Sequence, residues 1–241
     1  MLNRKILLQT TLGCLLLASA TSQAAIIGLQ NDITISGTSA PINWSSDLSS
    51  TSSSITQSGT TTQMMGSFSM DGVWDYNWNL MADADPFIGG TFSITNTSSI
   101  TQSFDITFSL PISPSFNDGY KTGSLGLSFS DTGGSSGASF SLTDWSGLID
   151  GATAMNLTTI SGPCIGTGCS VTLATITEGP TFFTGPVNSD IGIHMLFDLS
   201  AGDSVNFNTS FEVTPVPVPA TLWLLGSGLI GLAGFIRRRN S

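Results

Sequence analysis

Residues Phe104–Ile112 read FDITFSLPI and decide the fold class, because apolar and polar side chains alternate along them. The large apolar residues share one face, and polar residues occupy the other face as far as Pro111. A period of two is typical of a strand in an antiparallel sheet with one buried face. We therefore expect this segment to be a strand that covers a core.

The segments around it repeat the pattern, while helical periodicity is nearly absent. Thr91–Thr95 (TFSIT) alternates in the same way, and the short polar stretch Asn96–Ser99 that follows predicts a hairpin with Phe104–Ile112. Turn formers such as Asp131–Gly134 separate the other candidates. These are Trp74–Leu80, Leu125–Phe129, Val171–Leu173, Ile191–Leu199 and Val205–Val213.

About ten short antiparallel strands predict an all-β protein built as a two-sheet sandwich. A jelly-roll and an immunoglobulin-like topology both fit this pattern. Ser45–Thr62 departs from it, because 13 of its 18 residues are Ser or Thr. We expect this Ser/Thr-rich segment to be a mobile loop or a weak edge strand.

The N-terminus has the features of a secretory signal peptide. Arg4 and Lys5 precede an apolar run that is too short to span a bilayer, and small residues follow it. Cleavage after Ala20 or after Ala24 fits the small-x-small rule, and we place the signal peptide at residues 1–24. Cys14 lies inside the apolar run, so we do not expect it to be lipidated.

The C-terminal residues 215–241 have three parts. Proline alternates with valine up to Pro219, and an apolar, glycine-bearing stretch of 17 residues follows at 220–236. As a helix this stretch would measure about 25 Å, the low edge for a single transmembrane helix. Arg237, Arg238 and Arg239 come directly after it and predict a cytoplasmic C-terminus.

This arrangement resembles the PEP-CTERM sorting tails of Gram-negative bacteria. The matching residues are Pro217-Val218-Pro219-Ala220, the glycine-bearing stretch and the arginine cluster Arg237–Arg239, with Val218 where the family most often has glutamate. The resemblance implies recognition by an exosortase, a membrane transpeptidase. The protein would be held in the inner membrane during sorting and would then pass to the cell surface or the extracellular space.

The body between these ends, residues 25–214, is strongly acidic. All 16 acidic residues lie in it, and Lys121 is its one basic residue, which gives a formal charge of −15. A body with one cation cannot neutralise a phosphate backbone, so we exclude nucleic acid as a partner. Frequent Ser, Thr, Gly and Asn residues indicate an extracellular β-protein.

Cys164 and Cys169 are the two cysteines of the body, five positions apart. In an oxidising compartment we expect them to form a disulfide that closes a small loop. A zinc site is the alternative. It is disfavoured because no further His or Cys lies near them in the sequence.

Two small-ligand sites are candidates. Trp74, Tyr76 and Trp78 form an aromatic row on one face of a strand, which either lines the core or stacks against sugar rings. Asp83 and Asp85 are candidate ligands of a weak calcium site, with turn capping as the alternative.

The sequence predicts a non-enzymatic protein. His194 is the sole histidine, and Asp198, on the same strand face, lies about 13 Å away along that strand, too far for a local dyad. We expect a surface or matrix protein associated with exopolysaccharide, the link to polysaccharide being implied by the resemblance, with a carbohydrate-binding module as the alternative.

Overall fold

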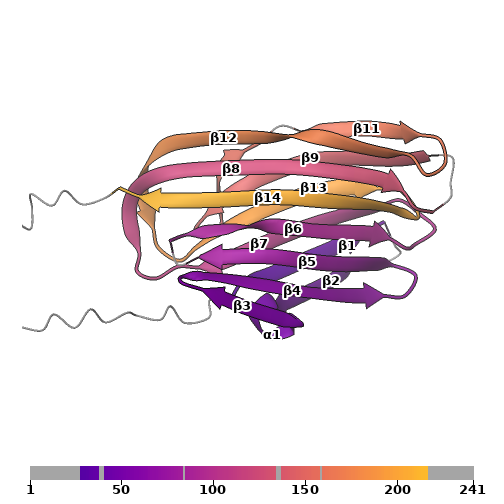
Figure 1. Cartoon of the computed structure of the whole chain (residues 1–241). Helices are drawn as coiled ribbons and strands as arrows, with labels where there is room; N and C mark the ends of the chain where they lie inside the picture. Colours follow the sequence, from indigo (N-terminus) through magenta and orange to yellow (C-terminus); the bar gives the residue numbers. More distant parts are fainter. Residues whose placement is uncertain (1–27, 38–40, 84, 134–136, 158, 217–241) are drawn as a thin grey trace, which may run out of the picture.

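The computed structural model describes residues 28–37, 41–83, 85–133, 137–157 and 159–216. These residues form two seven-stranded antiparallel sheets that pack face to face as a β-sandwich (Figure 1). The all-β, two-sheet prediction is confirmed. The predicted signal peptide (1–24) and membrane segment (220–236) lie outside the described residues.

Sheet A has the strand order β10-β9-β13-β7-β1-β2, and β11 also pairs with β9. Its strands are β1 (Gln30–Ser36), β2 (Ile42–Asp47), β7 (Gln102–Pro111), β9 (Gly137–Ile149), β10 (Ala152–Asn156), β11 (Ile160–Ile165) and β13 (Asp190–Leu199).

Sheet B has the order β12-β8-β14-β6-β5-β4-β3. Its strands are β3 (Ser54–Ser58), β4 (Thr61–Met70), β5 (Trp74–Asp83), β6 (Phe87–Asn96), β8 (Phe116–Asp131), β12 (Ser170–Val187) and β14 (Asp203–Pro215). The long strands β8, β12 and β14 run the length of the sandwich (Figure 1).

The segment that decides the fold class becomes β7, in the interior of sheet A between β1 and β13. Phe104, Ile106, Phe108 and Leu110 are completely buried. Phe104 stacks on Phe197 of β13 at 5.3 Å between ring centroids, and Phe197 contacts Phe207 of sheet B at 5.0 Å. One-sided burial of this strand thus joins the two sheets.

The predicted hairpin between Thr91–Thr95 and Phe104–Ile112 is wrong. The first segment lies in β6, which pairs with β5 and β14 in sheet B, whereas β7 belongs to sheet A. The link crosses between sheets, and the buried Asn96 holds it: its Nδ2 donates to the carbonyl oxygens of Ile100 at 2.8 Å and Leu199 at 2.9 Å. The apolar face of β6 therefore belongs to sheet B, and that of β7 belongs to sheet A.

The Ser/Thr-rich segment is ordered and lies at one side of the sandwich (Figure 1). It contains the short helix α1 (Leu48–Thr51), capped by Asp47, and β3, the edge strand of sheet B. All five residues of β3 are exposed. The weak-edge-strand alternative is thus the one observed. In the described part of the chain, no helix is long and apolar enough to cross a membrane.

Candidate functional site

An open groove of about 490 Å³ lies on the outer face of sheet B. Five strands line it, in the spatial order β12, β8, β14, β6 and β5. The lining residues are Asn77, Trp78, Asn79, Thr91, Phe92, Ser93, Gly126, Leu127, Ser128, Thr172, Leu173, Thr175, Asn206, Phe207 and Asn208.

Strand register aligns the polar lining residues in two rows that run across the strands. Alternate positions of each strand face outward, so pairing brings the same kind of side chain together on every strand. One row is Thr172, Ser128, Asn206, Ser93 and Asn77, and the other is Gly126, Asn208, Thr91 and Asn79. Hydroxyl and amide groups therefore recur along both rows, with Gly126 as a gap in the second row.

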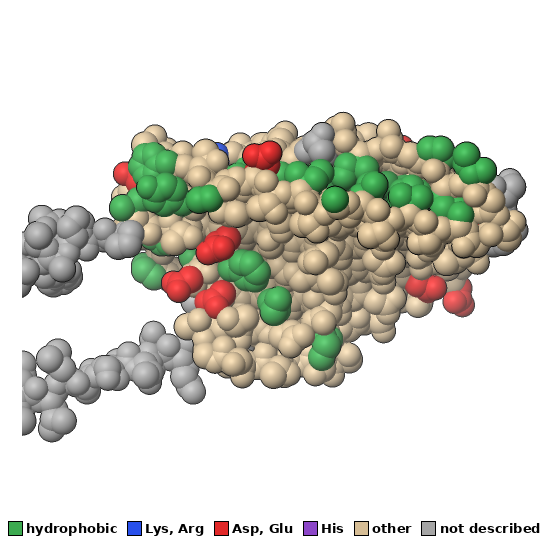
Figure 2. Space-filling view, turned by 45° about the horizontal axis from the view of Figure 1, so that its top comes forward, with side chains coloured by type: hydrophobic (Ala, Val, Ile, Leu, Met, Phe, Trp, Pro, Cys, Tyr) green, Lys and Arg blue, Asp and Glu red, His purple; other side chains and the backbone are tan. Residues whose placement is uncertain are grey.

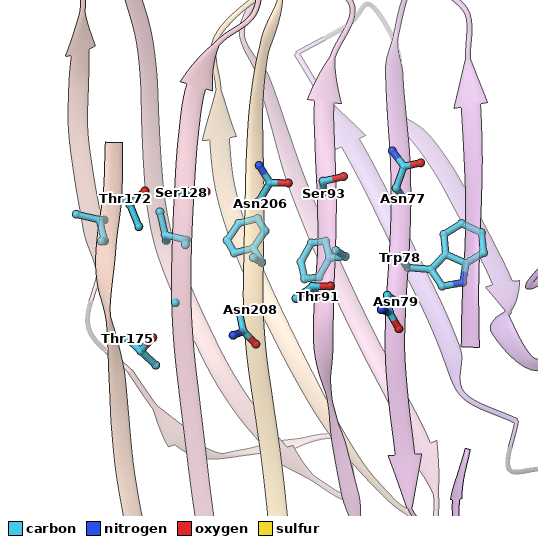
Figure 3. A pocket seen from close by; sticks show the side chains of 15 residues that line it. Asn77, Trp78, Asn79, Thr91, Ser93, Ser128, Thr172, Thr175, Asn206 and Asn208 are labelled. Carbon is cyan, nitrogen blue, oxygen red and sulfur yellow. The ribbon is translucent and has the colours of Figure 1, made fainter. Parts of the chain in front are cut away.

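Four asparagines dominate this surface (Figure 3). Asn206 and Asn208 stand on β14, while Asn77 and Asn79 stand two strands away on β5. Strand spacing and rise place them at the corners of a rectangle of about 10 Å by 7 Å. Asn79 Oδ1 accepts a hydrogen bond from Gln63 Nε2 at 2.7 Å, which fixes one corner.

The groove is electrically neutral: none of its fifteen lining residues is ionisable. Each asparagine amide offers two N–H donors and a carbonyl acceptor, and each serine or threonine hydroxyl both donates and accepts. Such a surface can hydrogen-bond to a polyhydroxylated ligand. It offers no acid, base or charged nucleophile for chemistry on that ligand.

The aromatic row lies in the core, so the sugar-stacking alternative is corrected. Trp74 and Tyr76 are 0 % exposed and Trp78 is 4 % exposed. The Trp78 indole packs against Gly66 of β4, where a Cβ atom would come within 2.2 Å of the ring. The row faces inward because Asp75, Asn77 and Asn79 take the outer positions of the same strand.

A hydrogen bond between the sheets fixes the centre of this row. Tyr76 Oη accepts from Asn31 Nδ2 of β1 at 2.9 Å, and both side chains are buried. Burial raises the pKa of the Tyr76 hydroxyl far above its usual range, with the Asn31 hydrogen bond opposing. The hydroxyl is therefore protonated at any ordinary pH and belongs to the scaffold.

Cys164 and Cys169 form a disulfide in the structure. It joins the end of β11 in sheet A to the residue before β12 in sheet B, and the Asp131 N–H donates to the Cys169 carbonyl at 3.0 Å. The disulfide thus secures a crossing between the sheets, at the opposite end of sheet B from Pro215.

Asp83 acts as a turn cap. Its Oδ2 accepts from Thr60 Oγ1 at 3.1 Å and Thr61 Oγ1 at 2.5 Å, and its Oδ1 accepts from the Asp85 N–H at 3.1 Å. Within the described residues, no three His, Cys, Asp or Glu side chains are grouped so as to hold a metal ion. Calcium at Asp83 and Asp85 stays a prediction.

His194 has two partners that the sequence did not indicate. Its Nδ1 lies 2.8 Å from Asp144 Oδ2 on β9, and its Nε2 lies 3.0 Å from Asp105 Oδ1 on β7. The Ser146 hydroxyl donates to Asp144 at 2.9 Å. The cluster therefore bridges three strands on the outer face of sheet A, with both ring nitrogens against carboxylates.

The C-terminal segment is the part of the chain that a comparison with known families identifies. Residues 215–239 match the model of the PEP-CTERM protein-sorting motif. The chain carries a PEP-CTERM sorting motif. Such a motif implies an exported protein that an exosortase processes and that is sorted to the cell surface. No curated protein is significantly similar to the chain in sequence.

The PEP-CTERM motif begins at the last residue of β14. Pro215 pairs with Gly119 of β8, and the Val216 N–H donates to the Asp118 carbonyl oxygen at 3.4 Å. The residues that carry the sequence resemblance (Pro217, Val218, Pro219, Ala220, Arg237, Arg238 and Arg239) lie outside the described residues. Sheet B therefore leads directly into the PEP-CTERM motif.

Proposed function

We propose that the protein is a non-enzymatic surface or matrix protein whose β-sandwich binds uncharged extracellular polysaccharide in the groove of sheet B. The observation that carries this proposal is the neutral surface of aligned Asn, Ser and Thr side chains on five neighbouring strands. The PEP-CTERM motif places the body outside the cytoplasm, where such a polymer is available.

The spacing of the amide groups suits a chain of sugars. Neighbouring hydroxyl groups of a sugar ring can accept from an amide N–H and donate to the amide carbonyl at the same time. Two rows about 7 Å apart along the strands offer such contacts to more than one sugar unit. Because the groove is open to solvent on the outer face of the sheet, it suits a stretch of a polymer that lies across it.

Charge selects against anionic polymers. The body carries fifteen more negative than positive charges, and its one lysine does not line the groove. The Lys121 ammonium donates instead to the Ala154 carbonyl oxygen of sheet A. An acidic polysaccharide would be repelled by the body without a compensating cation at the site.

The residues that line the groove also favour binding without hydrolysis. Glycoside hydrolysis usually requires two carboxyl groups about 5 to 10 Å apart, one of them a general acid. The lining residues include neither Asp nor Glu. A glycan bound there would meet hydrogen-bonding groups but no proton donor of suitable acidity.

Each individual site should bind weakly. Its hydrogen bonds form at a surface that water also solvates, so each contributes about 0.5–1.5 kcal/mol net. Many copies at a cell surface would contact one polymer at several points, and avidity would then raise the apparent affinity. This behaviour suits a protein that retains a matrix.

Affinity electrophoresis in gels that contain neutral or anionic polysaccharides tests the proposal. We expect neutral polymers to retard the exported protein, and Asn206→Ala with Asn208→Ala to abolish the retardation. Asn156→Ala is the matched control, because Asn156 is an exposed asparagine on β10 of sheet A. A parallel gel with a calcium chelator tests whether calcium contributes to the retardation. Retardation that is equal in the groove variant and the control would contradict the proposal.

A further inference from the structure

A small hydrophobic patch lies on sheet B at the end where β14 finishes. It consists of Tyr120, Phe182 and Val216, which are 44 %, 52 % and 40 % exposed. Tyr120 and Phe182 lie opposite each other on β8 and β12, with ring centroids 5.4 Å apart. Figure 2 shows hydrophobic side chains gathered at this end of the molecule. We call these three residues the end patch.

The chain leaves the sandwich beside the end patch. Thr214 pairs with Tyr120, and Val216 lies next to Asp118 two residues further along the same pair of strands. Three residues, Pro217 to Pro219, then separate Val216 from the apolar stretch 220–236. Fully extended, the chain from Val216 to Ala220 spans at most about 14 Å.

This short tether restricts the body while the tail is in the membrane. If residues 220–236 span the bilayer, the end patch must lie within reach of the lipid headgroups. The opposite end of β14, at Asp203, is about 40 Å farther away along the strand. The tether thus holds the Pro215 end of the 13-residue strand β14 near the membrane and leaves its Asp203 end free.

We propose that the end patch rests in the interfacial layer of the membrane before the tail is removed, and so orients the body for processing. The inference depends on insertion of the tail and is independent of glycan binding. Tyrosine suits the contact, since its ring is apolar and its hydroxyl reaches water, and aromatic rings are enriched at headgroup depth.

Local charge indicates which lipid surface fits. Asp118 and Glu212 flank the patch on β8 and β14, and the ammonium of Lys121 is engaged with Ala154. The contact therefore depends on burial of apolar surface. It should be stronger on zwitterionic than on anionic membranes, and on zwitterionic membranes it should be nearly insensitive to salt.

Hydrogen exchange on the full chain in phosphatidylcholine vesicles tests this inference. Three proteins are compared: the wild type, Tyr120→Ser with Phe182→Ser, and Ile165→Ser. Ile165 is the matched control because it is 86 % exposed and is the last residue of β11, beside the disulfide at the opposite end of the sandwich. Vesicle flotation reports tail insertion separately.

We expect backbone amides of 116–119, 183–185 and Val187 to exchange several-fold faster in the double variant than in the wild type, with flotation unchanged. Ile165→Ser should match the wild type. Equal exchange in all three, or failure of the full chain to float, would overturn the inference. Loss of neutral-polysaccharide binding in the double variant with unchanged exchange on vesicles would also overturn it, because the patch would then be a sugar-stacking site.

Discussion

Asp203 of β14 lies directly opposite Asp131 of β8, and both carboxyl groups are buried at the end of the sandwich far from Pro215. Burial raises the pKa of Asp203, and the charge of Asp131 adds to the shift, while a hydrogen bond from the Ser200 hydroxyl opposes it. Asp203 therefore makes the stability of the fold depend on pH.

For a carboxyl group whose pKa is raised by folding, the protonated form is the one that the folded state favours. The stability that such a group contributes is fully present below its pKa in the unfolded chain, about 4. It is lost as the pH rises through the pKa in the folded state. Asp203→Asn removes this loss. We expect the melting temperature of the variant, relative to that of the wild type, to increase as the pH is raised from 4.

The exposed Asp198→Asn serves as the control for Asp203→Asn, since its side chain is in solvent on sheet A. The melting temperature of Asp198→Asn should differ from that of the wild type by the same amount at every pH. A constant difference in melting temperature between Asp203→Asn and the wild type at every pH would show that Asp203 does not titrate as described.

Trp145 and Thr209 form a buried hydrogen bond between the sheets. Trp145 Nε1 of β9 donates to Thr209 Oγ1 of β14 at 2.8 Å, and the Thr209 hydroxyl donates to the Ser124 carbonyl oxygen at 3.0 Å. Thr209→Val keeps the shape and removes both bonds. Because the indole N–H would be left unsatisfied, we expect a loss of about 1–3 kcal/mol in the free energy of unfolding by urea.

Thr209→Ser keeps the hydroxyl group and is the matched control for Thr209→Val. It should lose less stability than the valine variant although it removes a methyl group. A valine variant that loses no more stability than the serine variant would contradict a dominant role of the two hydrogen bonds.

Asp150 holds the turn between β12 and β13. Its Oδ1 accepts from the N–H groups of Ser189 at 2.7 Å and Asn188 at 2.9 Å, and its own φ is 50°. Slight burial raises its pKa, but the bonds from Ser189 and Asn188 outweigh this, so the pKa is lowered overall. The stability that the ionised Asp150 carboxylate contributes is present above about pH 4 and is lost as the pH falls through its pKa in the folded state.

We expect Asp150→Ala to cost about 1–2 kcal/mol at pH 7, since alanine tolerates the left-handed conformation poorly. Asp150→Asn tolerates that conformation and should cost less, while losing the acid dependence. Urea unfolding at pH 7 and pH 3 separates the two effects. An alanine variant as stable as the asparagine variant at pH 7 would contradict the strain argument.

Gly66 makes room for the Trp78 indole at the edge of the core. A Cβ atom at this position would lie 2.2 Å from the ring, so Gly66→Ala must displace Trp78. Overpacking of this kind costs about 1–3 kcal/mol. We expect a lower melting temperature and a changed near-ultraviolet circular dichroism signal. Gly72→Ala, at a turn with open space but a φ of 70°, should lower the melting temperature without that spectral change.

Local alternation was sufficient to predict β7, because one-sided burial leaves a period of two in the sequence itself. For the Trp74 row it left the core and sugar stacking as alternatives, and burial in the structure decides for the core. The hairpin prediction failed because proximity in sequence does not reveal which sheet a strand joins. The decisive contact is the bond from Asn96 to Leu199, 103 residues away.

The groove could not be predicted for the same reason. Asn77 and Asn206 are each visible as outward polar positions, but their alignment depends on the pairing of β5 with β6 and of β6 with β14. The His194 partners Asp105 and Asp144 also come from different strands. The disulfide and the sorting motif, by contrast, depend on residues close together in sequence.

The side-chain amides of the groove asparagines give the most direct measurement of the central claim. In 15N-labelled protein, titration with a neutral polysaccharide should shift the side-chain NH2 signals of Asn77, Asn79, Asn206 and Asn208. The signals of Asn156 on sheet A and Asn188 at the Asp150 turn should stay in place. Binding that leaves the four groove signals unchanged, or that shifts those of Asn156 and Asn188 instead, would contradict glycan recognition by sheet B.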